Sequence, residues 1–256
     1  MRRLAERAYF VCCQGVAWLL RSARYLKVRP EDRAGEPMIR KDRLFYAPLL
    51  VWLSGPVVGL LGGGVRVLPQ RDWLERERSI YRALDRRSIR LDEGGTLLLP
   101  RLQGETLAAL LDKPGLVESD RASAIRLAAL ALARLHHLGF THADAMAENV
   151  MIDLETGSAS WFDFETVHDP TRSLTWQHAD DVRALVSSCV ARTDDATCAV
   201  TVHLILDAYG DADVERVLAA SFTSAFRRAL AFHLSQAELS FAADRQIAQI
   251  LDQRRR

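Results

Sequence analysis

Apolar residues recur at helical spacing in two long segments of the chain. In residues 71–84, Trp73 and Ile80 fall on one stripe, and in residues 119–137 a stripe of alanines and leucines ends just before Gly139. Apolar residues at intervals of three and four predict an amphipathic helix, and a glycine directly after such a segment is typical of a helix C-terminus. We therefore predict helices over both segments.

Other stretches give shorter or weaker patterns. Helical spacing also runs through residues 3–28, 179–185 and 195–252. Short apolar runs at residues 65–68 and 97–100 are rich in Val or Leu and are bounded by Gly or Pro, which predicts strands. The helical segment 195–252 contains no recognisable motif.

Two N-terminal segments do not fit these patterns. Residues 29–43 are polar and contain Pro30, Gly35 and Pro37, which predicts a linker. Residues 44–65 carry no charge over nearly the length of a membrane span, although two prolines and five glycines interrupt them. We interpret the uncharged segment as a buried hairpin or helix pair, and an interfacial or re-entrant membrane element is the alternative.

The length and charge of the chain narrow the possible domain organisation and the possible kinds of partner. Its 256 residues suit one large domain or two small lobes sharing a cleft. The net charge of +1 gives no argument for nucleic acid as a partner. Residues 1–43 nevertheless hold eleven Lys or Arg against five acidic residues, and the chain ends in three arginines. An anionic membrane surface is one interpretation of this distribution, and a solvated basic face is the other.

The cysteines indicate a reducing compartment. Cys12, Cys13, Cys189 and Cys198 show no metal-ligand spacing, and the adjacent pair is poorly placed for an ordinary disulfide. The start of the chain is followed by a mixed polar and apolar helix without a cleavage-like site, so we expect no signal peptide. These features predict a reduced, cytoplasmic protein.

Two polar motifs in the second half of the chain carry the candidate chemistry. His-Ala-Asp-Ala-Met-Ala-Glu-Asn occupies residues 142–149, and Trp-Phe-Asp-Phe-Glu occupies residues 161–165. The predicted order of helix, loop, strand, turn and strand can bring Asp144, Asn149 and Asp163 to one cleft. Phosphoryl transfer uses one carboxylate to orient the attacking hydroxyl, and an amide oxygen with a second carboxylate to hold the Mg²⁺ that bridges the nucleotide phosphates.

These motifs resemble those of the protein-kinase-like superfamily. Residues 142–149 match its catalytic loop, H-x-D-x-x-x-x-N, and Asp-Phe-Glu at 163–165 stands in the place of D-F-G. Met146 occupies the position of the loop lysine of Ser/Thr protein kinases, and no A-P-E motif follows. The departures are similar to those of atypical bacterial kinases such as the lipopolysaccharide-core and Kdo sugar kinases. The resemblance covers roughly residues 75–190.

The resemblance implies a fold and an activity. The fold would be α+β and bilobal, with a basic N-terminal helix and linker in residues 1–43, a reduced small lobe in 44–100 and a mostly helical large lobe in 101–256. The cofactors would be ATP with Mg²⁺ or Mn²⁺, and the acceptor would be a hydroxyl group, which we expect on a sugar or lipid-linked saccharide. The location would be the cytoplasm, with the inner face of the cell membrane as a further option. The alternatives are an atypical Ser/Thr protein kinase and a pseudokinase that binds a nucleotide or a partner.

The resemblance also implies roles for individual residues. Asp144 would orient and deprotonate the acceptor hydroxyl, while Asn149 and Asp163 would hold the metal. His142 and Asp181 would support the loop, with Asp181 accepting hydrogen bonds from its backbone N–H groups.

The expected nucleotide-binding residues lie before the catalytic loop. Gly63 belongs to a glycine cluster that could cover the phosphates, and Leu102 lies in the predicted hinge between lobes. Glu77 lies on the apolar stripe of its helix, where a carboxylate is costly unless it is paired; a solvated edge position is the alternative. We assign its partner, the phosphate-anchoring cation, to Arg66, and Lys27 is the second candidate.

Overall fold

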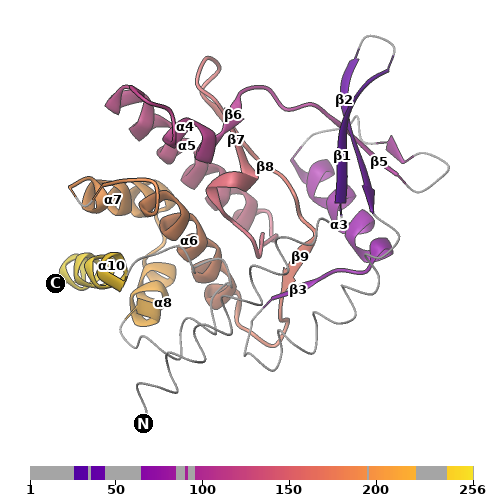
Figure 1. The fold of residues 1–256 in the computed structure, drawn as a ribbon. Helices are drawn as coiled ribbons and strands as arrows, with labels where there is room; N and C mark the ends of the chain where they lie inside the picture. The colour runs from indigo at the N-terminus through magenta and orange to yellow at the C-terminus, as the bar shows by residue number, and fades with distance from the viewer. Residues whose placement is uncertain are drawn as a thin grey trace.

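The computed structural model describes residues 26–33, 36–43, 65–84, 90–91, 96–194, 196–222 and 241–255. These residues form a mixed α+β fold (Figure 1). A four-stranded sheet and helix α3 lie together on the right of Figure 1, most of the helices lie on the left, and short strands lie between them. The α+β class expected from the sequence is confirmed.

The four-stranded sheet begins earlier in the chain than the sequence suggests. Its order is β1-β2-β5-β4. The strands are β1 Leu26–Arg33, β2 Glu36–Arg43, β5 Leu97–Pro100 and β4 Arg90–Leu91. β1 and β2 form an antiparallel hairpin, and β2 pairs antiparallel with β5 through Met38↔Pro100 to Lys41↔Leu97.

The predicted linker over residues 29–43 is therefore wrong, and residues 26–28, at the end of the segment with helical spacing, belong to β1. The hairpin looks like a linker because β1 is the outer strand of the sheet. An outer strand tolerates prolines and charged side chains that a central strand would exclude. The boundary expected at residue 44 falls directly after β2, so the sheet includes residues assigned to the N-terminal segment.

Helix α3, Gln70–Ala83, follows the short strand β3, Val65–Val67. Its buried residues are Trp73, Glu77, Ile80 and Tyr81, and the first three lie on the stripe that the sequence predicts. β3 pairs antiparallel with β9, Thr166–His168, and the N–H of Leu68 donates to the oxygen of Glu165 at 2.8 Å. The start of α3 is thus tied to the segment that follows Asp163.

A three-stranded antiparallel sheet of order β6-β7-β8 connects the two parts of the molecule. Its strands are β6 Glu105–Thr106, β7 Val150–Asp153 and β8 Ser158–Trp161. The motif at residues 142–149 directly precedes β7, and the motif containing Asp163 directly follows β8. Because β7 and β8 form a hairpin, the two motifs meet at the same end of it.

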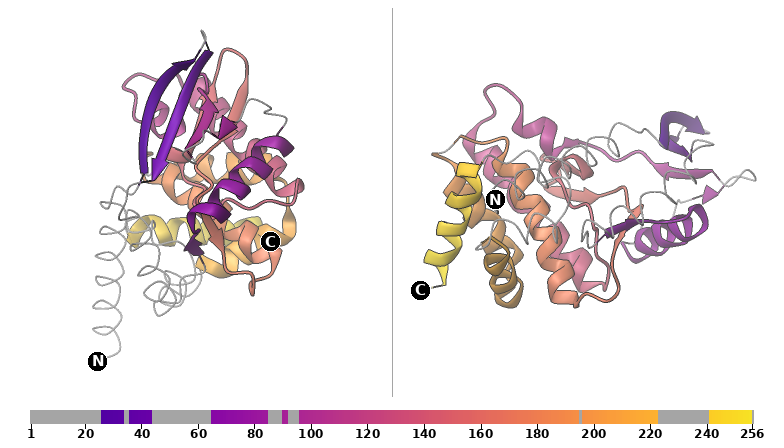
Figure 2. Two further views of the ribbon diagram at one scale, coloured as in Figure 1. Left: turned by 90° about the vertical axis from the view of Figure 1, so that its right-hand side faces the viewer. Right: turned by 60° about the horizontal axis from the view of Figure 1, so that its bottom comes forward.

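The helical part is built around its two longest helices, α5 Glu118–His137 and α6 Leu174–Val190. The other described helices of this part are α4 Leu107–Leu111, α7 Cys198–Tyr209, α8 Ala212–Phe222 and α10 Phe241–Arg254. α10 packs against α7 and α8, as Figure 2 also shows. The helix predicted over 119–137 is confirmed as α5, and the described residues of 195–252 are mainly helical, as expected.

Two sequence predictions lie outside the described residues. They are the N-terminal helix as far as residue 25 and the uncharged segment up to residue 64. Among the helices of the described ranges, none combines the length and the apolar character that a bilayer crossing requires.

Candidate active site

Asp144 and Asn149 face each other within residues 142–149, which we call the catalytic loop after the motif that they resemble. The side-chain nitrogen of Asn149 donates to the carboxylate of Asp144 at 2.8 Å and to its main-chain oxygen at 2.9 Å. The loop between them is closed by hydrogen bonds from Met146 N to Asp144 O at 2.8 Å and from Asn149 N to Met146 O at 2.9 Å. With its nitrogen committed to Asp144, the amide of Asn149 has its oxygen available as a metal ligand.

Asp181, on α6, holds the first residues of this loop through its carboxylate. Its carboxylate accepts the N–H groups of His142 and Ala143, each at 2.7 Å, and the Nε2 of His136 lies 2.9 Å away. The hydrogen bonds that the sequence predicts for Asp181 are present. They hold Ala143 at a φ of 63°, a left-handed conformation that an alanine rarely adopts. Burial opposes the charge of Asp181, but the nearby imidazoles, chiefly His168 and His136, outweigh it and hold the pKa of this carboxyl far below its usual value.

His142 joins the catalytic loop to the segment that contains Asp163. Its Nε2 lies 2.9 Å from the oxygen of Phe162, and its ring lies against Phe164, with centroids 4.8 Å apart. Burial lowers the pKa of His142, which keeps the ring neutral, so Nε2 carries the proton and donates to Phe162. His142 thus positions the neighbouring Asp163.

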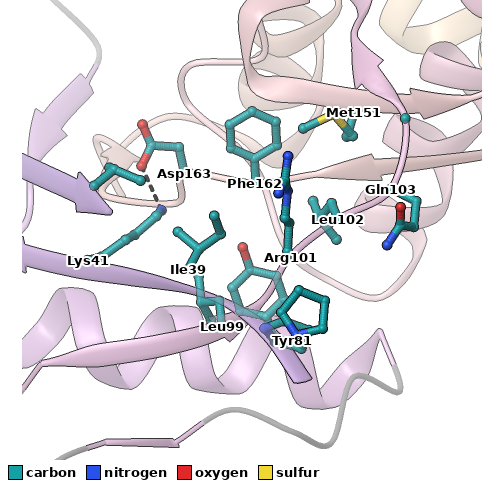
Figure 3. Close-up of a pocket in the computed structure, with 14 residues that line it drawn as sticks. Ile39, Lys41, Tyr81, Leu99, Arg101, Leu102, Gln103, Met151, Phe162 and Asp163 are labelled. Carbon is teal, nitrogen blue, oxygen red and sulfur yellow. Dashed lines mark hydrogen bonds and ion pairs between the residues drawn. The ribbon is translucent and has the colours of Figure 1, made fainter. Parts of the chain in front are cut away.

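Asp163 forms an ion pair with Lys41, a residue to which the sequence analysis assigns no role. The Nζ of Lys41, on β2, lies 2.9 Å from Oδ1 of Asp163 and 2.9 Å from Oε1 of Glu77 (Figure 3 shows the first contact). Asp163 has a φ of 71°, which turns its carboxylate toward the sheet. Burial of Lys41 opposes its charge, but Asp163 and Glu77 outweigh that effect and raise the pKa of Lys41 well above its usual value.

The expectation that Arg66 is the cation paired with Glu77 is wrong. Arg66 lies on β3, where it pairs with Val167 of β9, and its side chain is exposed. Glu77, which is fully buried, takes Lys41 as its partner, so the prediction that it is paired is confirmed with a different cation. Burial raises the pKa of Glu77, and Lys41 limits the rise. The second candidate, Lys27, lies on the neighbouring strand β1.

A cavity of about 560 Å³ opens beside this ion pair. Val28, Ile39, Leu99, Leu102 and Phe162 supply much of its apolar wall, and Lys41 with Asp163 closes one end (Figure 3). Leu102, expected in a hinge, therefore lines the cavity.

Gly104 allows the chain beyond Leu102 to pass close to β7. Its φ is +90°, and a Cβ at this position would lie 2.0 Å from the main-chain oxygen of Ile152. No side chain fits there. Gly63, the other glycine of interest, lies outside the described residues.

Histidines gather with Asp181 beneath the catalytic loop. The rings of His136 and His178 stack with centroids 4.0 Å apart, and Nδ1 of His136 lies 2.7 Å from the hydroxyl of Tyr209. Nε2 of His168 lies 3.0 Å from a carboxylate oxygen of Asp180. Burial and the neighbouring His136 lower the pKa of His178 to about 4.

The stacked His178 should make the fold sensitive to mild acid. The unfolded chain protonates this histidine near its ordinary pKa of about 6.5, whereas the folded chain keeps it neutral to about pH 4. The free energy of unfolding should therefore fall as the pH decreases through this window. The variant His178→Phe retains a ring against His136. We expect its free energy of unfolding, measured with urea between about pH 7 and pH 5, to fall less steeply with decreasing pH than that of the wild type. The same change at the exposed His137 is the control, and equal slopes for wild type and His178→Phe would contradict the assignment.

Within the described residues, no cluster of three or more His, Cys, Asp or Glu side chains is arranged to hold a metal ion. Mg²⁺ is commonly bound by one or two carboxylates together with substrate phosphates, and Asp163 with Asn149 offers ligands of that kind.

The site thus brings together most of the residues expected from the sequence. Asp163 lines the cavity, and Glu77 pairs with Lys41 at the same end. The main-chain oxygen of Asn149 accepts the N–H of Phe162, which also lines the cavity, and Asn149 in turn holds Asp144. Asp181 supports the start of the loop. No family model matches the chain, and no curated protein matches it either. The geometry of the site is accordingly what bears on function.

Proposed function

We propose that this protein is a kinase-like phosphotransferase that moves the terminal phosphoryl group of ATP to a hydroxyl group. The observation that carries the proposal is the position of Lys41, within 2.9 Å of both Glu77 and Asp163 at the end of the cavity. A lysine held between a helix glutamate and a metal-binding aspartate is the arrangement by which kinases anchor nucleotide phosphates. In this proposal the sheet with α3 is the small lobe, and the helical part is the large lobe.

The cavity suits a nucleotide in size and lining. Its volume, about 560 Å³, falls within the range of small-molecule sites, which are mostly apolar with a few placed polar groups. The base would lie between Ile39 and Leu99 of the sheet and Phe162 of the opposite wall. The phosphates would lie at the end marked by Lys41 and Asp163, where a cation and a metal ligand can neutralise them.

Asp163 and Asn149 would hold Mg²⁺ or Mn²⁺. When bound, the ion would neutralise charge on the nucleotide phosphates. Asp144 would accept the proton of the acceptor hydroxyl and orient it. Asn149 holds the carboxylate of Asp144 in place through the 2.8 Å hydrogen bond, so the base is positioned before the acceptor arrives.

The acceptor is more readily a saccharide or lipid-linked saccharide than a peptide. Only residues 169–173 connect β9 to α6, and a turn fills them, with Arg172 N donating to Asp169 O. This connection is too short to present a groove for an extended peptide. Met146, at the loop position where Ser/Thr protein kinases have a lysine, is buried and offers the acceptor no charge.

Catalysis is favoured over a pseudokinase role by Lys41. Absence of a phosphate-anchoring lysine would favour a pseudokinase role, whereas Lys41, paired with Glu77 and Asp163, can serve as that anchor. A cytoplasmic location, with the inner membrane face as the place of a lipid-linked acceptor, remains part of the proposal.

The first experiment measures nucleotide binding and phosphoryl transfer separately. Titration calorimetry of purified protein with ATP should give binding that requires Mg²⁺ or Mn²⁺. Incubation with γ-labelled ATP and a total saccharide and lipid extract should then transfer label to a saccharide fraction, and EDTA should prevent it. Metal-dependent binding without transfer to any fraction would favour the pseudokinase, label on protein would favour the protein kinase, and absence of nucleotide binding would refute the proposal.

A further inference from the structure

Helix α3 carries Glu77 and so determines whether Lys41 is correctly placed. Two contacts tie this helix to the segment that contains Asp163. At its start, Leu68 N donates to Glu165 O at 2.8 Å, and near its end the ring of Tyr81 meets that of Phe164 edge-on, with centroids 5.7 Å apart. Both contacts lie away from the catalytic loop itself.

Arg76 makes a third contact, and it reaches the catalytic loop directly. Its guanidinium donates to the main-chain oxygen of Thr141, the residue before His142. Thr141 is buried, and burial lowers the pKa of Arg76 while the nearby Asp181 opposes the shift. The Nε of Arg76 is buried and has no hydrogen-bond partner within the described ranges. A desolvated guanidinium is costly, so its contact with the loop calls for an explanation beyond packing.

We propose that Arg76 is a positioning residue that locks α3 onto the catalytic loop and thereby holds Glu77 against Lys41. The inference rests on the proposed function, since the ion pair matters through the nucleotide phosphates. Because Arg76 and Glu77 are adjacent on one helix, an outward movement of α3 that breaks the Glu77–Lys41 pair also breaks the bond to Thr141. The ion pair is thus set by contacts within the fold, and α3 needs no added modification to reach its place.

The three lysines of the chain make this lock measurable without any activity assay. They are Lys27, Lys41 and Lys113. Lys41 is buried and paired on two sides, whereas the side chain of Lys113 is 47% exposed. An amine-reactive label read by mass spectrometry should modify Lys41 slowly and Lys113 rapidly in the wild type. The ratio of the two rates then reports how often the Lys41 pair opens.

We expect Arg76→Ala to raise the labelling rate of Lys41 relative to Lys113 by about tenfold or more, the factor that a hydrogen bond to a charged group contributes. Binding of Mg²⁺ and ATP should weaken as well, because part of the protein has α3 displaced. Arg76→Lys should restore part of both effects, since lysine keeps the charge and one donor but loses the planar fork. Arg82→Ala, an exposed arginine on the same helix, is the matched control and should change neither.

The outcomes separate this inference from the proposed function. If Arg76→Ala lowers the melting temperature but leaves the Lys41 labelling ratio of the folded protein unchanged, Arg76 only stabilises the fold and the inference is overturned. If the wild type binds no nucleotide but Arg76→Ala still exposes Lys41, the lock is real and the proposed function fails. An Arg82→Ala effect equal to that of Arg76→Ala would also refute the specific role of Arg76.

Discussion

The variant Asp144→Asn should lose phosphoryl transfer and retain nucleotide binding. A positioned general base contributes about 10²–10⁴-fold to a rate, so we expect kcat to fall by that factor. Asparagine has the same shape, and its side-chain oxygen can accept the hydrogen bond from Asn149 that Asp144 accepts at 2.8 Å. The loop should therefore keep its structure, and Lys41 and Asp163 remain to bind the nucleotide. Transfer of label from γ-labelled ATP and calorimetric titration with ATP and Mg²⁺ measure the two properties.

The control for this prediction is Asp153→Asn, in the turn between β7 and β8. Asp153 accepts the N–H groups of Glu155 and Thr156 outside the site, a role that asparagine can also fill. Transfer by Asp153→Asn should match the wild type. Unchanged turnover in Asp144→Asn would remove Asp144 from the mechanism, whereas equal loss of binding and turnover would assign it to the nucleotide site.

Much of the candidate site could be predicted from sequence because its residues are closely spaced in the chain. The catalytic loop and the motif containing Asp163 are separated only by the β7–β8 hairpin, which itself brings them together. Glu77 could be identified from a local conflict, a carboxylate on an apolar helix stripe, which predicts a partner without naming it. Asp181 could be identified from the resemblance to the kinase-like motifs, although its helix, α6, begins at Leu174 and not at residue 179 as the helical spacing suggests.

The partner of Glu77 could not be predicted because it comes from a segment whose local pattern is misleading. Lys41 lies 36 residues before Glu77 and 122 before Asp163. Its strand contributes Pro37, Ile39 and Lys41 to the cavity from one face, whereas Arg40 and Asp42 lie on the other face with the buried Met38. Two features of the sequence could have pointed to Lys41. One is the alternation of residues along this strand, and the other is the rarity of lysine, since only three of the 34 basic residues are lysines.

The pairing of β3 with β9 is a second feature that could not be predicted from the sequence. Each strand has three residues, too few for a periodic pattern, and the pairing joins segments about a hundred positions apart. Arg76 is similar: on the sequence it is one of several arginines of an amphipathic helix. Its contact with Thr141 depends on the angle at which α3 meets the loop, which only the tertiary structure fixes.

Replacing Lys41 by methionine should both weaken nucleotide binding and destabilise the fold. The fully buried Glu77 would lose its cation, and breaking a buried ion pair by removing one partner costs about 3–5 kcal/mol. The pKa of Glu77, already raised by burial, should rise further once Lys41 no longer limits it. The unfolded chain then releases this proton at its ordinary pKa of about 4.3, so the destabilisation should grow as the pH rises above that value. Urea unfolding at several pH values and titration with ATP and Mg²⁺ measure the two effects.

The double variant Lys41→Met, Glu77→Leu separates the structural role of the pair from its functional role. Removing both charges leaves no unpaired carboxylate, and replacing a buried ion pair by apolar residues is often neutral for stability. Stability and its pH dependence should therefore return toward the wild type, while nucleotide binding should not, because the phosphates still lack their anchor. Arg40→Met, a change at the neighbouring position on the opposite face of β2, should leave binding intact. Recovery of binding in the double variant would show that Lys41 serves only to neutralise Glu77, and the phosphate anchor would then have to be sought elsewhere.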